Sequence, residues 1–360
     1  MQQSGKEQEM KSSSRPGDFA SSKWQRIAPV ITLLLLAPII SEVLSGSTRI
    51  TTMFVLLPEI GIWGCGALII RFVARRWHKD WLSIFLMGMA LAVAEECIIQ
   101  QTSLAPLVGV DPNHVYSRAL GVNWLYLLWA LGYESIWVVM IPIQLTELIF
   151  PSQKDDPWMG SRGLVIAAIF FVLASFNAWY FWTQIFVPTY FPAAAYQPPV
   201  LETAVALAAI LILILIALMR PPTHRVEQNM ARLAPRPLIV GLMSFVFGLL
   251  WFLLILLAYG AVPTLPVLIP FLGSLILGGL GFTLLKSWTS SSGWQDAHRL
   301  ALMIGIIVAT GWGGFIVLTM NVVFTMSNAL MIDRVGQVGF NAIAILLLVF
   351  LSRRSQFSTS

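Results

Sequence analysis

Several glutamates lie inside long apolar segments of this chain, and four of them fall at a similar depth: Glu59, Glu95, Glu96 and Glu134. An ionised carboxylate in hydrocarbon costs about 2.5–3.5 kcal/mol at a helix centre, so such residues face a protein interior, a water-filled cavity or each other. No lysine or arginine is expected at the same depth. Protonation, hydrogen bonds from neutral polar side chains or an exogenous cation could therefore accommodate the charge. These four residues are the candidates for binding a proton or a cation.

The spacing around Glu96 predicts which way its side chain points. Residues four apart share one side of a helix, and this side carries Gly88, Ala92, Glu96 and Gln100. Small residues allow helices to approach closely, so Glu96 is expected to face the bundle interior. Glu95 is turned by about 100° on an α-helix and is expected to meet different neighbours.

The surroundings of the other candidates leave two interpretations open. Pro58 precedes Glu59 and three glycines follow it, a pattern of either a broken helix lining a cavity or tight packing. The acids could equally be protonated, hydrogen-bonded packing residues, which is the favoured interpretation for Glu42, Glu147 and Glu202 near segment ends. The residues expected to support the site with polar groups are Gln100, Asn123 and Asn177.

The elements that must position these residues are membrane-spanning helices. A spanning helix needs about 20 apolar residues. Ten such segments lie near 28–45, 51–73, 82–101, 121–149, 163–187, 199–219, 237–259, 264–285, 299–325 and 335–351. All but three of the 22 lysines and arginines fall in the two tails or in alternate connections, the exceptions being Arg49, Arg118 and Arg334. Because positive loops stay in the cytoplasm, both termini are expected there.

The fold class predicted is an all-α, polytopic integral membrane bundle. Residues 1–26 are expected to form a disordered polar cytoplasmic tail, 27–352 a single transmembrane domain and 353–360 a second cytoplasmic tail. Within the domain, residues 27–219 form six front helices that bear the acids. Residues 237–352 form four back helices with no acid inside a span.

Composition excludes several classes of protein. The chain is 57% hydrophobic and 11% charged, far from the roughly 25% charged residues of a soluble domain. Its net charge of +5 comes from basic residues at cytoplasmic helix ends, which indicates lipid contact and not nucleic-acid binding. We find no phosphate loop, dinucleotide fingerprint, zinc-protease helix or nucleophile elbow, so no cofactor, metal or catalytic residue is assigned.

Several segments resemble a family of uncharacterised bacterial multi-spanning membrane proteins. These are PIISEVLSGST (38–48), AEECIIQQTSLAP (94–106), LGVNW (120–124), LGYESIW (131–137) and PIQLTELIFP (142–151). The resemblance covers the front 160 residues. It implies an integral protein of a bacterial cytoplasmic membrane and carries no activity.

Glu95 and Glu96 also resemble the acid pair of the CPBP (Abi) intramembrane metalloproteases, whose helix carries EExxxR and whose later helices carry histidines. The arginine position holds Gln100 here, and no later span contains a histidine. A catalytic zinc normally has nitrogen ligands, so the resemblance implies a degenerate relative at most.

The favoured function is a transporter-like or channel-like protein with an outward-facing, carboxylate-lined cavity for a proton, a cation or a cationic substrate. The alternatives are a degenerate protease-like enzyme and a membrane scaffold without a small-molecule site. The expected partners are the lipid bilayer and a proton, cation or small molecule, with no nucleic acid.

Overall fold

The computed structural model describes residues 23–107, 116–190, 195–222, 229–320 and 331–357. Its front helices comprise α1 (Lys23–Pro38), η1 (Ile39–Val43), η2 (Ile50–Val55), α2 (Leu56–Glu59), η3 (Ile60–Gly64), α3 (Cys65–Arg76), α4 (Trp81–Ala94), η4 (Glu95–Ile99), α5 (Trp124–Tyr133), η6 (Glu134–Met140), α6 (Ile141–Ile149), η7 (Pro151–Gln153), α7 (Ser161–Ala178), η8 (Trp179–Phe186), α8 (Val187–Tyr190) and α9 (Val200–Met219). The back helices are α10 (Pro237–Ala258), α11 (Leu268–Thr289), α12 (Asp296–Met320) and α13 (Met331–Phe357).

The helices confirm the predicted polytopic bundle. Within the described residues, nine helices are long and apolar enough to cross a membrane, and the first expected span is a shorter apolar helix, Ile27–Val43. The ninth expected span reaches into residues 321–325, which lie outside the described residues. At the C-terminal end, α13 continues to Phe357, into the segment expected as a tail.

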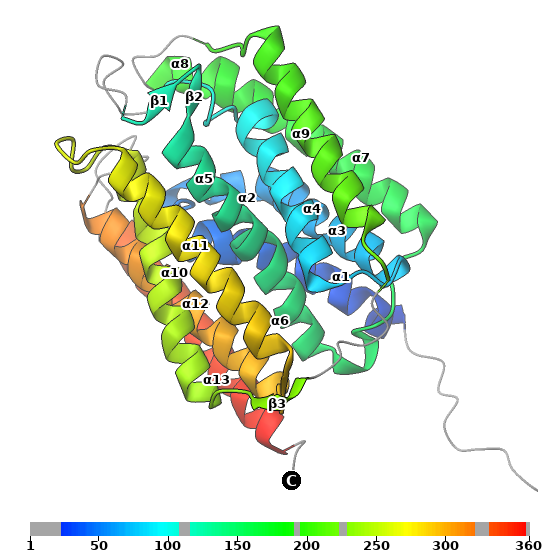
Figure 1. The fold of residues 1–360 in the computed structure, drawn as a ribbon. Helices are drawn as coiled ribbons and strands as arrows, with labels where there is room; N and C mark the ends of the chain where they lie inside the picture. The colour runs from blue at the N-terminus through cyan, green and yellow to red at the C-terminus, as the bar shows by residue number, and fades with distance from the viewer. Residues whose placement is uncertain (1–22, 108–115, 191–194, 223–228, 321–330, 358–360) are drawn as a thin grey trace, which may run out of the picture.

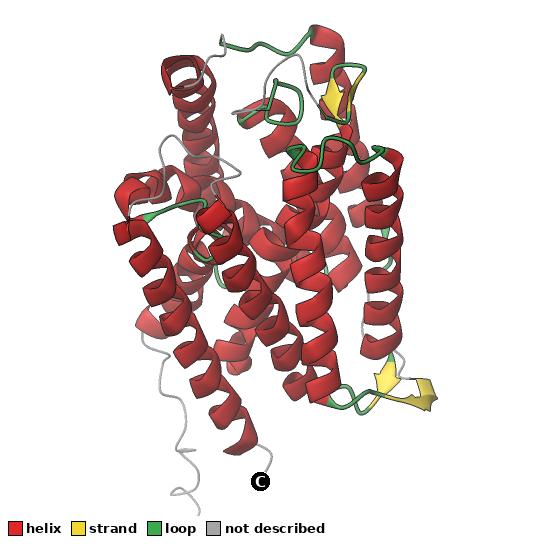
Figure 2. Ribbon diagram, turned by 90° about the vertical axis from the view of Figure 1, so that its left-hand side faces the viewer, coloured by secondary structure: helices red, strands yellow, loops and turns green. Residues whose placement is uncertain are grey.

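Figure 1 shows how the chain ends are placed. The beginning of α1 and the end of α13 lie at the same end of the bundle, together with β3 (Asn229–Leu233). The short strands lie near the two ends of the bundle (Figure 2), with β3 paired to β4 (Ser291–Ser292) and β1 (Arg118–Ala119) paired to β2 (Val122–Asn123). We call the end with β3 the basic end and the end with β1 and β2 the loop end.

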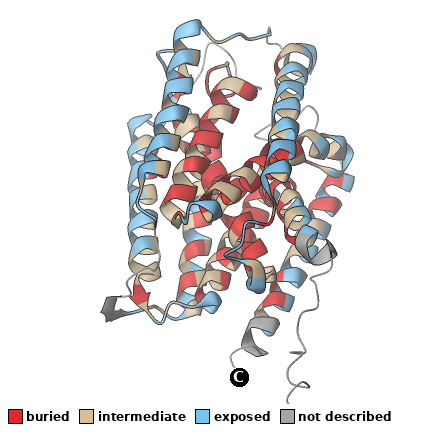
Figure 3. Ribbon diagram, turned by 90° about the vertical axis from the view of Figure 1, so that its right-hand side faces the viewer, coloured by how far each residue is buried: buried red, intermediate tan, exposed pale blue. Residues whose placement is uncertain are grey.

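Buried residues lie in the middle of the bundle, while the outer helices are largely exposed (Figure 3), and many of their exposed side chains are large and apolar. Only 11% of the apolar window of α9 is buried and 6% of that of the helix Ser161–Tyr190, which comprises α7, η8 and α8, whereas 67% is buried in the helix Trp124–Ile149. This last helix, made of α5, η6 and α6, packs against α4 on one side and against α10 and α12 on the other. It therefore joins the front helices to the back helices.

The positive-inside pattern makes a testable prediction of orientation. Lys154 at the basic end and Ala195 beyond α8 are both exposed. A cysteine at 195 should react with a membrane-impermeant thiol reagent in intact cells, because it lies outside, and a cysteine at 154 should be shielded. Permeabilised cells provide the control, in which both should react. Labelling at 154 in intact cells would reverse the orientation; position 228, also expected to be shielded, lies outside the described residues.

Candidate functional site

Three carboxyl groups meet inside the bundle. Glu95, Glu96 and Glu134 are each at most 5% exposed, and one carboxylate oxygen of each lies within 4.8 Å of the other two. We call these residues the Glu triad. Two neighbouring helices supply them, and these helices can approach closely because a Cβ at Gly88 of α4 would lie only 3.0 Å from Cα of Ser135 in η6.

The helices are π-helical where the acids lie. The segment η4 begins at Glu95, η6 begins at Glu134 and η1 contains Glu42. A further π-helical segment, η3, starts directly after Glu59. Such segments are rare and are frequently found at functional sites. The wider turn also changes the geometry, because it brings both Glu95 and Glu96 to Glu134, where α-helical periodicity predicts that Glu95 points elsewhere.

Neutral groups supply the hydrogen bonds to the Glu triad. The hydroxyl of Ser103 donates to Oε2 of Glu96 at 3.1 Å, and the Tyr126 hydroxyl is also within hydrogen-bonding range of Glu96. Carboxylate oxygens of the triad, one from each residue, also lie within 4.8 Å of one another. A hydrogen bond between two carboxyl groups needs a proton on one of them. Among the described residues, no salt bridge joins a basic side chain to the Glu triad.

A second pair of acids lies beside the Glu triad. The hydroxyl of Thr48 donates to Oε1 of Glu59, and Glu42 interacts electrostatically with both Glu59 and Glu96. Of the four candidate acids, the structure brings Glu95, Glu96 and Glu134 together, with Glu59 and Glu42 as their neighbours. Oε2 of Glu59 and Oε2 of Glu134 are buried without a hydrogen-bond partner. A buried acceptor left unpaired is costly, so these atoms are places for a proton or a cation.

The three residues expected to support the site lie in different places in the structure. Gln100 lines a crevice at the loop end of the front helices. Asn123 is fully buried, but its amide donates to the carbonyls of Thr102 (3.2 Å) and Ala105 (2.8 Å) and so fixes the loop after η4. Asn177 is exposed on α7 and does not contribute to the buried site. The cause is the peripheral position of α7, most of whose other exposed side chains are apolar.

The crevice is bordered by the loop after η4, by η8, by the start of α8 and by the loop before α9. The residues around it are Gln100, Thr102, Ala105, Pro106, Trp182, Thr183, Val187 and Tyr196. Gln100 lies four residues after Glu96, about one helical turn towards the loop end. Partial burial raises the pKa of Tyr196, against the opposing effect of Arg118, so its hydroxyl stays neutral. The crevice therefore offers neutral polar groups next to the helix that carries two triad acids.

An aromatic ladder separates the Glu triad from the back helices. Tyr126, Trp129, Tyr133 and Trp137 follow one face of α5 and η6, with ring centroids 5.5, 4.7 and 5.0 Å apart in order. Tyr133 donates to the carbonyl of Ser41 at 2.5 Å, and the Trp137 ring nitrogen donates to the Thr310 hydroxyl at 2.5 Å. The ladder was not expected from the sequence, although the spacing of three and four residues between the aromatics is a usable signal.

The donor set does not fit a catalytic zinc ion. The Glu triad offers oxygen atoms alone, whereas catalytic zinc sites include histidine or cysteine. Among the described residues, His78 follows α3 and His298 lies in the first turn of α12, both at the basic end. His114 and His224 lie outside the described residues. We derive no proteolytic step for this chain.

Most of the chain matches a known protein family. The model of an uncharacterized membrane protein family matches residues 31–358. The match confirms the resemblance to an uncharacterised multi-spanning family and extends it from the front helices to nearly the whole chain. No curated protein and no solved structure matches the chain.

Proposed function

The chain belongs to an uncharacterized membrane protein family, and from this premise we propose that it is a transporter that binds a proton or a small cation at the Glu triad. The proposal places the protein in a bacterial cytoplasmic membrane, with the basic end in the cytoplasm and the loop end outside. Its binding residues are Glu95, Glu96 and Glu134, with Glu59 as a neighbouring acid.

One observation carries this proposal: three buried carboxyl groups share a space 4.8 Å across, and no basic residue among the described ones forms a salt bridge with them. Like charges at this distance in a low-dielectric interior repel each other strongly. The triad therefore holds at least one proton, or a cation in its place. An exchangeable positive charge inside a membrane is what a proton or cation pathway requires.

Access from the loop end supports the same function. The crevice beside η4 ends about one turn from Glu96, and its polar lining is uncharged. A proton or a small cation could reach the Glu triad from this side by passing Arg118, which donates to the carbonyl of the lining residue Ala105 at 2.9 Å. Carboxylate oxygens are the ligands that hard cations prefer, so Na⁺, Mg²⁺ or Ca²⁺ fits the triad better than a soft metal ion.

The protease-like and scaffold alternatives make different predictions. An enzyme of the zinc-protease type would bind zinc, and metal analysis of the purified protein tests for it. In a scaffold, the triad acids would be protonated packing residues whose replacement by glutamine is silent. The transporter is favoured by the crowding of three buried carboxyl groups that form no salt bridge with a basic side chain among the described residues, because like charges held together are costly for packing alone.

The test is gradient-driven flux in proteoliposomes. The full chain is reconstituted, a proton, Na⁺ or Ca²⁺ gradient is imposed, and flux is followed with a dye for each ion. Glu96→Gln keeps the shape of the side chain but cannot ionise, so the flux should fall to that of empty vesicles. Glu202→Gln, the same change at a half-buried acid of α9, is the matched control and should transport normally. If Glu96→Gln behaves like the wild-type protein, the transporter proposal is wrong and the scaffold interpretation remains.

A further inference from the structure

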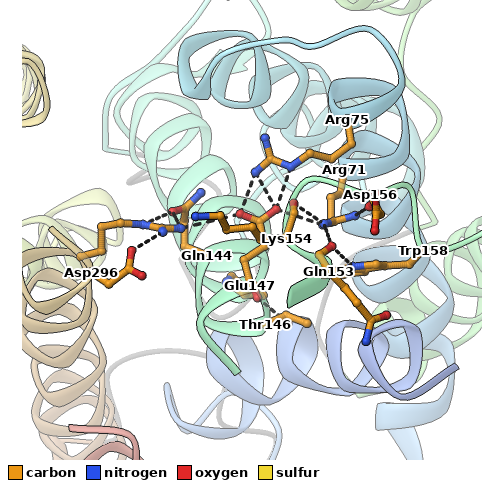
Figure 4. Close-up of polar contacts among 12 residues, drawn as sticks. Arg71, Arg75, Gln144, Thr146, Glu147, Gln153, Lys154, Asp156, Trp158 and Asp296 are labelled. Carbon is orange, nitrogen blue, oxygen red and sulfur yellow. Dashed lines mark hydrogen bonds and ion pairs between the residues drawn. The ribbon is translucent and has the colours of Figure 1, made fainter. Parts of the chain in front are cut away.

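A second charged cluster lies at the basic end, around the carboxylate of Glu147 (Figure 4). Glu147 is 2% exposed and is bound by arginines from two other helices. Arg71 Nε lies 3.1 Å from Oε1, and Arg75 binds both carboxylate oxygens through NH2, at 2.6 and 2.7 Å. A third arginine, Arg299 of α12, lies 3.7 Å from Oε2. We call these four residues the Glu147 cluster.

The Glu147 cluster also holds a loop across the end of the front helices. Arg71 is 1% exposed and donates to the backbone carbonyls of Gln153 (3.4 Å), Lys154 (2.8 Å) and Asp156 (3.0 Å). Its guanidinium carbon lies 3.2 Å from the ring centroid of Trp158. Figure 4 shows the chain after α6 running past Arg71. One buried side chain therefore fixes both Glu147 and the segment that follows it.

Arg299 connects the cluster to the back helices. It donates to Oε1 of Gln144 on α6 through Nε (3.0 Å) and NH2 (2.5 Å), and to Asp296 of its own helix at 2.8 Å. The ion pair between Asp80 and Arg220, at 2.6 Å, also lies at the basic end, but it joins α4 to the end of α9 within the front helices. The contacts of Arg299 thus cross the boundary between front and back.

The Glu147 cluster and the Glu triad share one helix. Glu134 and Glu147 lie 13 residues apart in the helix Trp124–Ile149, about 20 Å along its axis. The crevice adjoins the Glu triad from the loop end, and the Glu147 cluster lies beyond it towards the basic end. One carboxylate holds three arginines there, so loss of its charge would leave three like charges together. The structure shows the paired arrangement of the cluster.

We propose that the Glu147 cluster is the gate that closes the Glu triad off from the basic end, and that it opens when α12 carries Arg299 away from Glu147 and Gln144. The inference rests on the proposed function, because a gate serves a pathway. In this structure the cluster is paired, so the gate is closed at the basic end while the crevice adjoins the triad from the other side. Opening gives the bound proton or cation its exit.

The test measures the distance between front and back helices at the basic end, without measuring transport. Ser152 and Ala297 are both exposed there and receive spin labels, after the two buried native cysteines, Cys65 and Cys97, are replaced by alanine. The full chain in lipid nanodiscs should give mainly one short distance. Glu147→Gln and Arg299→Gln should each raise a longer-distance population about fivefold or more.

The controls separate the gate from general loosening. Asp80→Asn breaks the ion pair within the front helices and should leave the label distance unchanged. If Glu147→Gln does not fold, Arg299→Gln alone tests the gate. This variant should fold, because Arg299 is 21% exposed and its loss leaves Glu147 paired with Arg71 and Arg75. An unchanged distance in folded Arg299→Gln, or an equal change in Asp80→Asn, overturns the gate. A change in distance in a protein that moves no ion would refute the proposed function and leave the movement established.

Discussion

Replacing Glu134 with glutamine is expected to stop transport and, at the same time, to make the protein more stable. Oε2 of Glu134 is buried without a hydrogen-bond partner, and the other two triad acids crowd the same space. Glutamine keeps the shape of the side chain, removes one ionisable group from three and adds an amide that can donate to Glu95 or Glu96. The free energy of unfolding should rise by about 0.5–2 kcal/mol, the range of single stabilising substitutions.

Flux in proteoliposomes and thermal unfolding in one detergent should be measured on the same preparation of Glu134→Gln. The expected pair of results is flux at the level of empty vesicles and a higher melting temperature. Ser103→Ala is a useful comparison, because it removes a hydrogen bond to Glu96 without changing any charge and should lower stability. A Glu134→Gln protein that is both less stable and fully active would show that Glu134 is a structural hydrogen-bonded acid and contradict the proposed site.

The membrane helices could be predicted from the sequence because two strong signals agree. Apolar length predicted the spans, and alternation of basic residues predicted the side of each connection, which the labelling of positions 154 and 195 tests. Most boundaries differ from those of the structure by a few residues; the fourth span, for instance, was expected at 121–149 and is found at Trp124–Ile149. The similar depth of Glu95, Glu96 and Glu134 followed from the same signals, since neighbouring antiparallel helices place residues at equal distances from the membrane surface.

The contacts within the site could not be predicted, because they depend on departures from α-helical geometry. An α-helix places Glu95 and Glu96 about 100° apart, and it is the π-helical segment η4 that brings both to Glu134. No residue pattern in the sequence predicted the π-helical segments η4 and η6. The expectation that Asn177 supports the site did not hold for a different reason. Because α7 is apolar nearly all round, its sequence did not show that this helix lies at the periphery of the bundle.

The arginines that bind Glu147 could not be predicted from the sequence, because the basic run to which two of them belong is already explained by membrane topology. Arg71 and Arg75 belong to a run of basic residues that marks a cytoplasmic helix end, and the run does not show which of them turn inward. The spacing of four residues between them does place both on one face of α3. What sequence alone lacked was the second helix, because Glu147 and Arg71 are 76 residues apart and meet only when α3 packs beside α6.

Arg71→Ala is expected to be among the most destabilising single substitutions in the chain. It removes four hydrogen bonds, to Glu147 and to the carbonyls of Gln153, Lys154 and Asp156. It also removes the contact with the Trp158 ring and leaves a cavity in a site that is 1% exposed. Breaking a buried ion pair by deleting one partner costs about 3–5 kcal/mol, because the remaining charge stays buried. Glu147 keeps Arg75, which places the expected loss near the lower end of that range.

Unfolding of the purified protein in detergent, followed by heat and by denaturant, measures this loss against two further variants. Arg76→Ala removes an exposed arginine from the same helix end and should change the free energy of unfolding by no more than about 0.5 kcal/mol. Arg71→Lys keeps the charge but loses the planar fork that binds a carboxylate and several carbonyls at once, so it should fall between the two. If Arg71→Ala and Arg76→Ala have the same free energy of unfolding, the buried contacts of Arg71 do not stabilise the basic end.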